Sequence, residues 1–120
     1  MMPLKEVMMM SAKKQPNELS ENDIEQYLFN SAEKYNALCY KFISPMNSGV
    51  PDRIVILNGW TVFVELKAPG KKPRKLQEKV IEKMRKRHAS VYVIDSKELV
   101  DELFNDILSA RKRKSLNHFK

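Results

Sequence analysis

The dipeptide Asn58-Gly59 constrains the fold of this chain more than any other feature of its sequence. It separates two runs rich in β-branched and aromatic residues, 53–57 and 60–64. A type I′ turn needs positive φ at both central residues, which Asn and Gly tolerate better than other residues. The pattern therefore predicts an antiparallel β-hairpin with a two-residue loop, in which Leu57 pairs with Trp60.

Helical and extended patterns surround this hairpin. Ser20 followed by Asp23 is typical of a capping box, and apolar residues at helical spacing follow it. The expected elements are a helix over 21–35, a strand over 37–43, the hairpin, a helix over about 73–88, a strand over 90–94 and a helix over about 96–110. Because a helix precedes the last strand, that strand should run parallel to its neighbour. The expected fold class is α/β, with a mixed α+β sheet covered by helices.

Length and composition bound the remaining possibilities. The 120 residues favour one domain, over 20–110, between a flexible lead-in (1–19) and a basic tail (111–120). The single cysteine, Cys39, excludes an internal disulfide and a Cys-based zinc site. No apolar run is long enough to span a bilayer and no signal peptide is apparent. These features predict a cytoplasmic protein without a membrane partner.

The charge of the chain is strongly basic and unevenly distributed. It has 22 Lys and Arg against 15 Asp and Glu, a formal net charge of +7. Ten of the basic residues lie in 67–87, where the acidic residues are Glu78 and Glu82. Such an excess favours a polyanionic partner, most simply nucleic acid. A solvated basic helix face with a frayed tail is the alternative that composition leaves open.

The hairpin register brings acidic and basic side chains together. Continued outward from the turn, it places Asp52 opposite Glu65, and the strand period of two puts Lys67 on the same face. Two carboxylates this close repel each other unless a cation neutralises them, and Mg²⁺ prefers oxygen ligands. Lys67 could then orient or deprotonate water, or stabilise transition-state charge. An ordinary cross-strand ion pair is the alternative, although the neighbouring Ile54 and Phe63 are apolar.

These residues carry a family resemblance. The segment 49–53 (GVPDR), followed after the hairpin by 65–67 (ELK), resembles the Pro-Asp … (Asp/Glu)-x-Lys nuclease superfamily. More narrowly, it is similar to the VRR-NUC (virus-type replication-repair nuclease) domain of phage-type stand-alone proteins. The resemblance covers about 20–108 and includes Glu25, 40–42, 68–70, 76–77 and 91–95. It implies a restriction-endonuclease-like αβββαβ core followed by a C-terminal helix.

The resemblance also implies roles for individual residues. Asp52, Glu65 and the Leu66 carbonyl would bind Mg²⁺ or Mn²⁺, and Lys67 would be the catalytic lysine. Glu25 would reach the metal through water, and Gln77 would lie near the site. From the residues alone, Glu25 borders the apolar face of its helix and either points inward or lies at the surface, and Gln77 would be a surface residue. The expected DNA-binding residues are Lys41, Lys71, Lys72, Arg74 and Lys75.

The function expected from these features is that of a metal-dependent nuclease acting on DNA phosphodiesters. Specificity would come from DNA structure (four-way junction, flap or nick), from homodimerisation, or from a partner protein in replication or repair. A non-catalytic nucleic-acid-binding module with the same fold is the alternative. The last helix carries several apolar residues, which either form a dimer surface or pack onto the chain's own sheet: Leu99, Val100, Leu103, Phe104, Ile107 and Leu108.

Overall fold

The computed structural model describes residues 18–113, so residues 1–17 of the expected lead-in and 114–120 of the expected tail lie outside it. In chain order the elements are α2 (Glu21–Lys34), β1 (Leu38–Lys41), β2 (Arg53–Leu57), β3 (Trp60–Leu66), α3 (Lys75–Lys86), β4 (Ser90–Ile94) and α4 (Lys97–Ser109). This confirms the predicted αβββαβ core with a C-terminal helix. Within the described range, no helix is both long and apolar enough to cross a membrane.

The four strands form one mixed sheet in the order β1-β2-β3-β4. β1–β2 and β2–β3 are antiparallel, and β3–β4 is parallel, as the intervening helix predicted. Asn58 and Gly59 have φ values of 54° and 80°, so the turn has the positive φ angles of type I′. The predicted register is present from Leu57 opposite Trp60 at the turn to Arg53 opposite Val64 at the far end.

Two strands differ in extent from their predicted ranges. β3 continues two residues further, because Glu65 and Leu66 pair with Val93 and Ile94 of β4. β1 is shorter than expected: its ladder with β2 ends where Lys41 faces Arg53. One hydrogen bond continues beyond this last pair, from the Phe42 N–H to the Asp52 carbonyl (2.8 Å), before the two chain segments separate.

Helix α2 begins at the predicted capping box. The Ser20 hydroxyl accepts a hydrogen bond from the Asp23 N–H (3.2 Å), and the Asp23 carboxylate accepts one from the Ser20 N–H (2.9 Å). The helix ends before Asn36, whose φ of 59° is the left-handed conformation that Asn adopts readily. The cap fixes where α2 begins, and therefore where Glu25 lies in its first turns.

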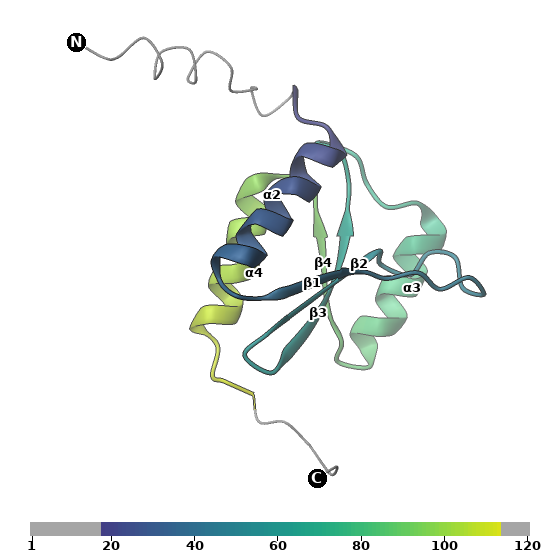
Figure 1. Ribbon diagram of the computed structural model, residues 1–120. Coiled ribbons are helices and arrows are strands. Elements are labelled where there is room, and N and C mark those ends of the chain that lie inside the picture. Colours follow the sequence, from purple (N-terminus) through teal and green to yellow (C-terminus); the bar gives the residue numbers. More distant parts are fainter. Residues whose placement is uncertain (1–17, 114–120) are drawn as a thin grey trace.

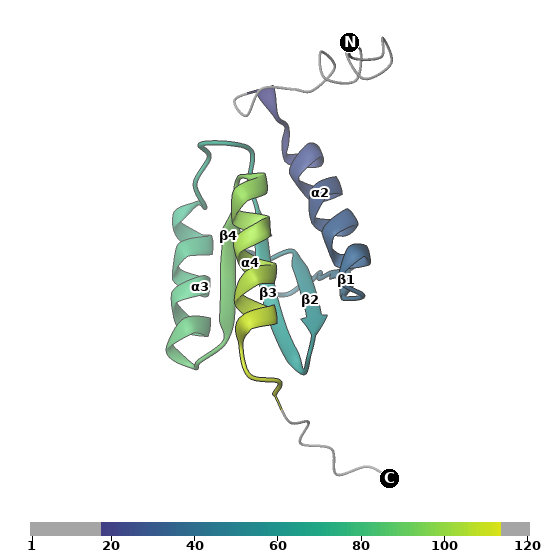
Figure 2. The same cartoon turned by 90° about the vertical axis from the view of Figure 1, so that its left-hand side faces the viewer.

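The helices cover the two faces of the sheet unequally. In Figure 1, α2 and α4 lie on one side of the strands and α3 on the other. Figure 2 shows α2 and α4 side by side over the sheet, with α3 at the β4 edge. The buried core lies between the sheet and the α2–α4 pair: Ile24, Leu28, Ala32, Val55, Val62, Val64, Leu66, Ile94, Val100, Leu103, Phe104 and Ile107. The sheet and these two helices therefore form the main packing unit.

The apolar residues of α4 pack onto the chain's own sheet. Val100, Leu103, Phe104 and Ile107 are buried in the core, and among these apolar residues Leu108 is the one that remains largely exposed (45%). Of the two alternatives that the sequence left open, own-chain packing is the one observed, and the apolar face of α4 is used within the chain.

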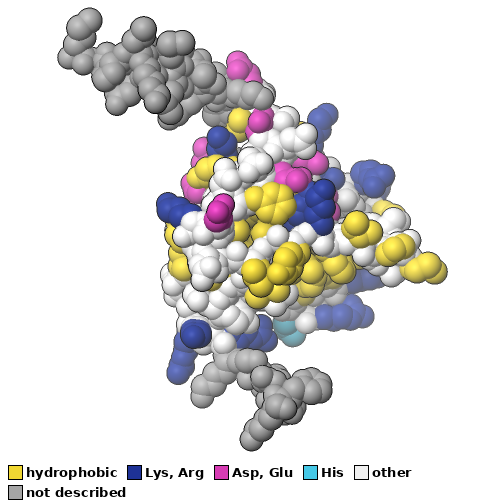
Figure 3. Space-filling view, in the orientation of Figure 1, with side chains coloured by type: hydrophobic (Ala, Val, Ile, Leu, Met, Phe, Trp, Pro, Cys, Tyr) yellow, Lys and Arg dark blue, Asp and Glu magenta, His cyan; other side chains and the backbone are white. Residues whose placement is uncertain are grey.

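The face of the sheet that carries α3 is only partly covered, because α3 packs against β4. β1 is the edge strand opposite β4, and its residues Leu38 and Tyr40 are about half exposed (50% and 54%). Ile43 and Met46 in the following loop are exposed. Figure 3 shows hydrophobic side chains gathered over β1 and this loop. Phe42 and Phe63 meet edge to face on this side, with ring centroids 5.9 Å apart.

The beginning of the basic tail lies against the hairpin. The Trp60 indole N–H donates to the Arg111 carbonyl (3.2 Å), and the Arg113 guanidinium lies over the Trp60 ring, 5.1 Å from its centroid. The Arg113 N–H donates to the Asn58 carbonyl (3.1 Å). Residues 111–113 therefore pack on the domain, and Trp60 has a packing role at the hairpin.

Candidate active site

Ionisable side chains collect at the end of the sheet opposite the Asn58–Gly59 turn. Asp52 directly precedes β2, Glu65 lies near the end of β3, and Lys67 follows that strand. Val64 and Leu66 point into the core between the sheet and helices α2 and α4. Because side chains alternate along a strand, Glu65 and Lys67 point to the other face, toward α3.

Glu65 is a buried carboxylate with an incomplete set of partners. Its residue is 4% exposed, and its Oε2 accepts from Gln77 Nε2 (3.1 Å) and lies 3.2 Å from Lys67 Nζ. Its Oε1 is also buried and has no hydrogen-bond partner among residues 18–113. Burial and the negative charge of Asp52 raise the pKa of Glu65, against the opposing effects of Lys67 and Gln77. A buried oxygen without a partner is the kind of donor that a cation would complete.

Gln77 ties the start of α3 to this carboxylate. It is buried (7% exposed), and while its Nε2 donates to Glu65, its Oε1 accepts from the Arg74 N–H at the helix start (3.2 Å). The residue-only interpretation of Gln77 as a surface side chain was wrong, because sequence spacing did not show that the loop between β3 and α3 turns this helix face toward β3. The placement implied by the family resemblance is the one observed.

The loop before Asp52 packs closely on the same helix. Gly49 has a φ of 94°, and a Cβ there would lie 3.3 Å from side-chain atoms of Leu76 and Val80 and 3.4 Å from the Gln77 Cα. A side chain at this position would be strained both by the backbone conformation and by the contact. Gly49 thus allows the segment leading to Asp52 to lie against the helix that carries Gln77.

Asp52 lies between the buried Glu65 and solvent. Its side chain is 38% exposed. Its Oδ1 accepts a long hydrogen bond from the Leu66 N–H (3.4 Å), and its Oδ2 lies 3.3 Å from Arg53 Nη1. The first contact holds Asp52 beside the main chain of Leu66, so two carboxylates and this stretch of backbone come together, as the register predicted.

Arg53 is a site residue that the sequence analysis missed. It is 7% exposed, its Nη2 is hydrogen-bonded to Glu25 Oε2, and its Nη1 donates to the Asp52 carbonyl (2.8 Å). A signal for it was present: Arg53 shares its sheet face with Val55 and Val64, which are fully buried. A cation among buried valines needs an anionic partner, and Glu25 was the acid already singled out in the leading helix. The Glu25 carboxylate therefore points inward, toward Arg53.

The donor set at Asp52 and Glu65 fits a hard divalent cation. It offers carboxylate oxygens, one of them buried without a partner, next to the main chain of Leu66. Within residues 18–113, no three His, Cys, Asp or Glu side chains are grouped closely enough to hold a metal by themselves. Mg²⁺ is commonly bound by one or two carboxylates, with other oxygens completing its shell, so two carboxylates are sufficient.

Four of the five expected DNA-binding residues lie next to this site. Lys71, Lys72, Arg74 and Lys75 are exposed on the segment that joins β3 to the first turn of α3. Gly70 turns this segment with a φ of 76°, and its N–H donates to Asp95 (3.3 Å). The basic side chains are therefore presented to solvent beside Glu65 and Gln77.

Lys41, the fifth, lies on the opposite face of the sheet. It is exposed and is paired with Arg53, so it shares the face of Arg53 and not that of Glu65. Tyr40, paired with Ile54, is the β1 residue that shares the carboxylate face. The sequence could not decide between these two neighbours, because the face depends on the β1–β2 register.

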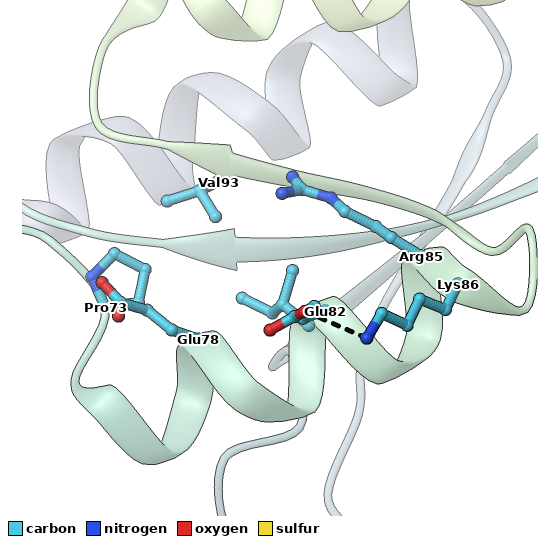
Figure 4. A pocket seen from close by; sticks show the side chains of 7 residues that line it. Pro73, Glu78, Glu82, Arg85, Lys86 and Val93 are labelled. Carbon is cyan, nitrogen blue, oxygen red and sulfur yellow. Dashed lines mark ion pairs between the residues drawn. The ribbon is translucent and has the colours of Figure 1, made fainter.

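A cavity of about 480 Å³ lies between α3 and β4 (Figure 4), and neither Asp52 nor Glu65 lines it. Its lining includes apolar side chains and an ion pair between Lys86 and Glu82 (3.2 Å). Its lining residues are Pro73, Glu78, Ile81, Glu82, Arg85, Lys86 and Val93. None of these was a predicted site residue, so the charged cluster lies outside this cavity.

Comparisons with known proteins agree with this geometry. No protein-family model matches the chain. The chain is 42% identical over 82 residues to the protein named "Putative nuclease p44" of Acyrthosiphon pisum secondary endosymbiont phage 1, a match that covers 68% of this chain and 88% of that protein. A solved structure described as a VRR_NUC domain superimposes with a TM-score of 0.66 at 36% identity, over 71% of this chain and 94% of that one. The chain therefore belongs to the VRR-NUC family of the PD-(D/E)xK superfamily.

Proposed function

We propose that this protein is a divalent-cation-dependent nuclease that hydrolyses phosphodiester bonds of DNA. The name of its phage relative and the VRR_NUC fold support a nuclease. The observation that carries the proposal is the state of Glu65, which is buried, has an unpartnered oxygen and lies beside both Asp52 and Lys67. A protein that only bound nucleic acid would have no need to hold paired carboxylates where phosphates approach.

Asp52, Glu65 and the main-chain carbonyl of Leu66 are the groups that would hold Mg²⁺ or Mn²⁺. When bound, the cation supplies positive charge against the phosphate oxygens and their developing negative charge. In the hydrolysis, a water oxygen forms a bond to phosphorus, a bridging P–O bond breaks, and a proton goes to the leaving oxygen. The protein groups have to orient that water and stabilise the charge that appears on the phosphate.

Lys67 and Gln77 would act on either side of Glu65. The Lys67 Nζ, 3.2 Å from Glu65 Oε2 and with 17% of its side chain exposed, can reach both the carboxylate and a bound phosphate. We propose that it donates to the attacking water or to a phosphate oxygen in the transition state. Gln77 would hold the Glu65 carboxylate in one orientation through its 3.1 Å hydrogen bond.

The DNA backbone would lie over the basic segment between β3 and α3. Lys71, Lys72, Arg74 and Lys75 are exposed there and adjoin the carboxylates, so phosphates bound by them pass close to Glu65. Lysines and arginines that contact phosphates fix the position of the duplex and carry little sequence information. We therefore propose recognition of DNA structure, such as a four-way junction, a flap or a nick.

A homodimer would account for cleavage of two strands, because one carboxylate cluster cuts one strand at a time. Since the apolar residues of α4 are used in the core, the exposed side chains of β1 offer the surface for a second copy. A partner protein of replication or repair is the other source of specificity. Light scattering distinguishes the two, since a dimer has twice the chain mass of 14.0 kDa.

The function is tested by incubating the protein with labelled linear, nicked, flap and four-way DNA, with Mg²⁺, Mn²⁺ or a chelator. We expect cleavage with either cation, loss of cleavage with the chelator, and a preference for branched DNA over linear duplex. Binding of the same DNAs with no cleavage under any condition would contradict the proposal and favour the non-catalytic nucleic-acid-binding module.

A further inference from the structure

One buried guanidinium joins two of the acidic side chains at this end of the sheet. Arg53 is hydrogen-bonded to Glu25 of α2 through Nη2, and its Nη1 lies 2.8 Å from the Asp52 carbonyl and 3.3 Å from Asp52 Oδ2. Its side chain is 8% exposed, and its Nε is buried with no hydrogen-bond partner in the described part of the chain. Arg53 therefore depends on these two partners to compensate its buried charge.

The planar fork of Arg53 is what makes this bridge possible. Arginine presents several donors in a fixed geometry, whereas lysine offers a single compact ammonium. Here one edge of the guanidinium faces the helix α2 and another faces the residue that begins the hairpin. The Arg53 guanidinium therefore lies between Glu25 and Asp52 and contacts both carboxylates.

The charges around Asp52 and Glu65 nearly cancel because Arg53 lies beside these carboxylates. Asp52, Glu65 and Glu25 contribute three negative charges, and Arg53 and Lys67 contribute two positive ones. Removing Arg53 would leave three carboxylates against a single ammonium. The cluster would then attract a divalent cation more strongly, because the attraction between opposite charges at these separations is substantial even after solvent reduces it.

We propose that Arg53 is a positioning residue that acts as a resident counter-cation: it holds Glu25 back from the metal centre and competes with the divalent cation for Asp52. The proposal rests on the cation site described above. In the metal-free protein, Glu25 is then the ion-pair partner of Arg53, and this pair influences the affinity of the site for the divalent cation.

The effect can be measured without DNA, by calorimetric titration of the metal-free protein with Mn²⁺. Arg53→Met should tighten Mn²⁺ binding by about tenfold, since a positive charge is lost and Glu25 is released. The same variant should cleave DNA more slowly, because Asp52 is no longer held in one orientation. The double variant Arg53→Met/Glu25→Gln restores the original charge balance, so its Mn²⁺ affinity should return to within about threefold of the wild type.

A second variant covers the case in which Arg53→Met does not fold. Glu25→Gln leaves Arg53 in place with Asp52 as its remaining anionic partner, so Mn²⁺ binding should weaken by about tenfold. The matched control is Glu33→Gln, on the same helix but exposed near its C-terminal end, where loss of one charge should change the affinity by less than about twofold. Circular dichroism confirms that each variant is folded.

The outcomes separate this inference from the proposed function. Mn²⁺ affinity that is unchanged or weaker in folded Arg53→Met, or unchanged in Glu25→Gln, would overturn the role of Arg53 while leaving the cation site in place. A wild-type protein that binds no Mn²⁺ would overturn the proposed function and the role of Arg53 with it.

Discussion

Two acidic clusters lie at the same end of the sheet and satisfy their carboxylates in opposite ways. On the α2 side, the Glu25 carboxylate meets the guanidinium of Arg53, a buried cation with few other partners. On the α3 side, Glu65 shares one oxygen between Lys67 and Gln77, and its other oxygen is buried with no partner among the residues that the structure describes. The charges of Glu25 and Arg53 compensate each other, whereas Glu65 keeps a buried oxygen that accepts no hydrogen bond from the described residues.

The difference indicates which cluster carries chemistry. Breaking a buried ion pair costs several kcal/mol, so a paired cluster mainly holds parts of the protein in place. A buried polar atom without a partner costs stability in the free protein and is retained where a ligand completes it. We therefore assign positioning to the Glu25–Arg53 side and cation binding to the Glu65–Asp52 side, and the predictions below for Asp52, Lys67, Glu65 and Glu25 test that division.

The largest expected effect is that of Asp52→Asn. The change removes a proposed metal ligand and its charge while conserving shape, so cleavage should fall by about a thousandfold or more, with the fold intact. Single-turnover cleavage of labelled branched DNA with saturating Mg²⁺ measures this, and thermal melting checks the fold. A variant that cleaves at the wild-type rate would show that the carboxylate pair is not the active site.

Lys67→Ala should lower turnover by about a hundredfold without weakening cation binding, because an ammonium stabilises the reaction but is no metal ligand, and its loss removes a positive charge beside Glu65. Calorimetry with Mn²⁺ and single-turnover kinetics on the same sample separate the two effects. Lys79→Ala, an exposed lysine on the outer part of α3, is a suitable control. Loss of Mn²⁺ affinity in Lys67→Ala would mean that the lysine supports the site's structure instead of its chemistry.

Charge reversal at Lys71, Lys72, Arg74 and Lys75 should weaken DNA binding by about tenfold or more at low salt and reduce the salt dependence of the binding constant. For every phosphate that these side chains no longer neutralise, the slope of log K against log salt should become shallower by about 0.9. Cleavage at saturating DNA should change much less. A salt slope equal to that of the wild type would show that this segment does not bind the DNA backbone.

The buried Glu65 carboxylate should lower the free energy of unfolding of the metal-free protein. Burial and the Asp52 charge raise its pKa above the ordinary glutamate value, so ionisation of Glu65 lowers the free energy of unfolding as the pH rises from that value through the raised pKa. Glu65→Gln should therefore raise the melting temperature of the metal-free protein near neutral pH by a few degrees, as about 1 kcal/mol does in a domain of this size.

The gain in Glu65→Gln should shrink as the pH falls toward the ordinary glutamate value of 4.5, where the wild-type carboxyl is protonated as well. Thermal melts across this pH range measure the difference between the two proteins. A melting temperature that decreases at neutral pH, or a gain that does not depend on pH, would contradict the assigned environment of Glu65.

The smallest expected effect lies outside both clusters. The Tyr27 hydroxyl donates to Asp101 (2.7 Å) and joins α2 to α4, and this hydrogen bond is the main reason that its pKa rises to about 12. Because the contact is exposed, Tyr27→Phe should lower the free energy of unfolding by less than about 0.5 kcal/mol. The difference should disappear as the pH rises from 10.0 toward about 12, where the tyrosine ionises. Urea melts measure it.

The secondary structure was predictable because its signals are local. Asn58 and Gly59 require a particular turn, and the turn sets the register that brings Asp52 to the side of Glu65. The Ser20 cap likewise determines where α2 starts. These features depend on backbone conformations of a few neighbouring residues, so composition and spacing are sufficient to identify them.

The interactions between elements were not predictable from the residues alone. Gln77 reaches Glu65 across a loop, and Arg53 reaches Glu25 across 28 positions of sequence. Both depend on which helix face turns toward the sheet, which hydrophobic packing decides over the whole fold. The family resemblance supplied the place of Gln77, and although the register placed Arg53 on the face of Val55 and Val64, its contact with Glu25 became apparent only in the structure.

The most direct test of the division between the two clusters compares Glu65→Gln with Glu25→Gln in single-turnover cleavage at rising Mg²⁺. Both variants replace one carboxylate by an amide of the same shape. We expect Glu65→Gln to lose at least about a thousandfold at every Mg²⁺ concentration, and Glu25→Gln to lose about tenfold and to recover when Mg²⁺ is raised. Equal, unrecoverable loss in both variants would contradict the account, as would wild-type activity in Glu65→Gln.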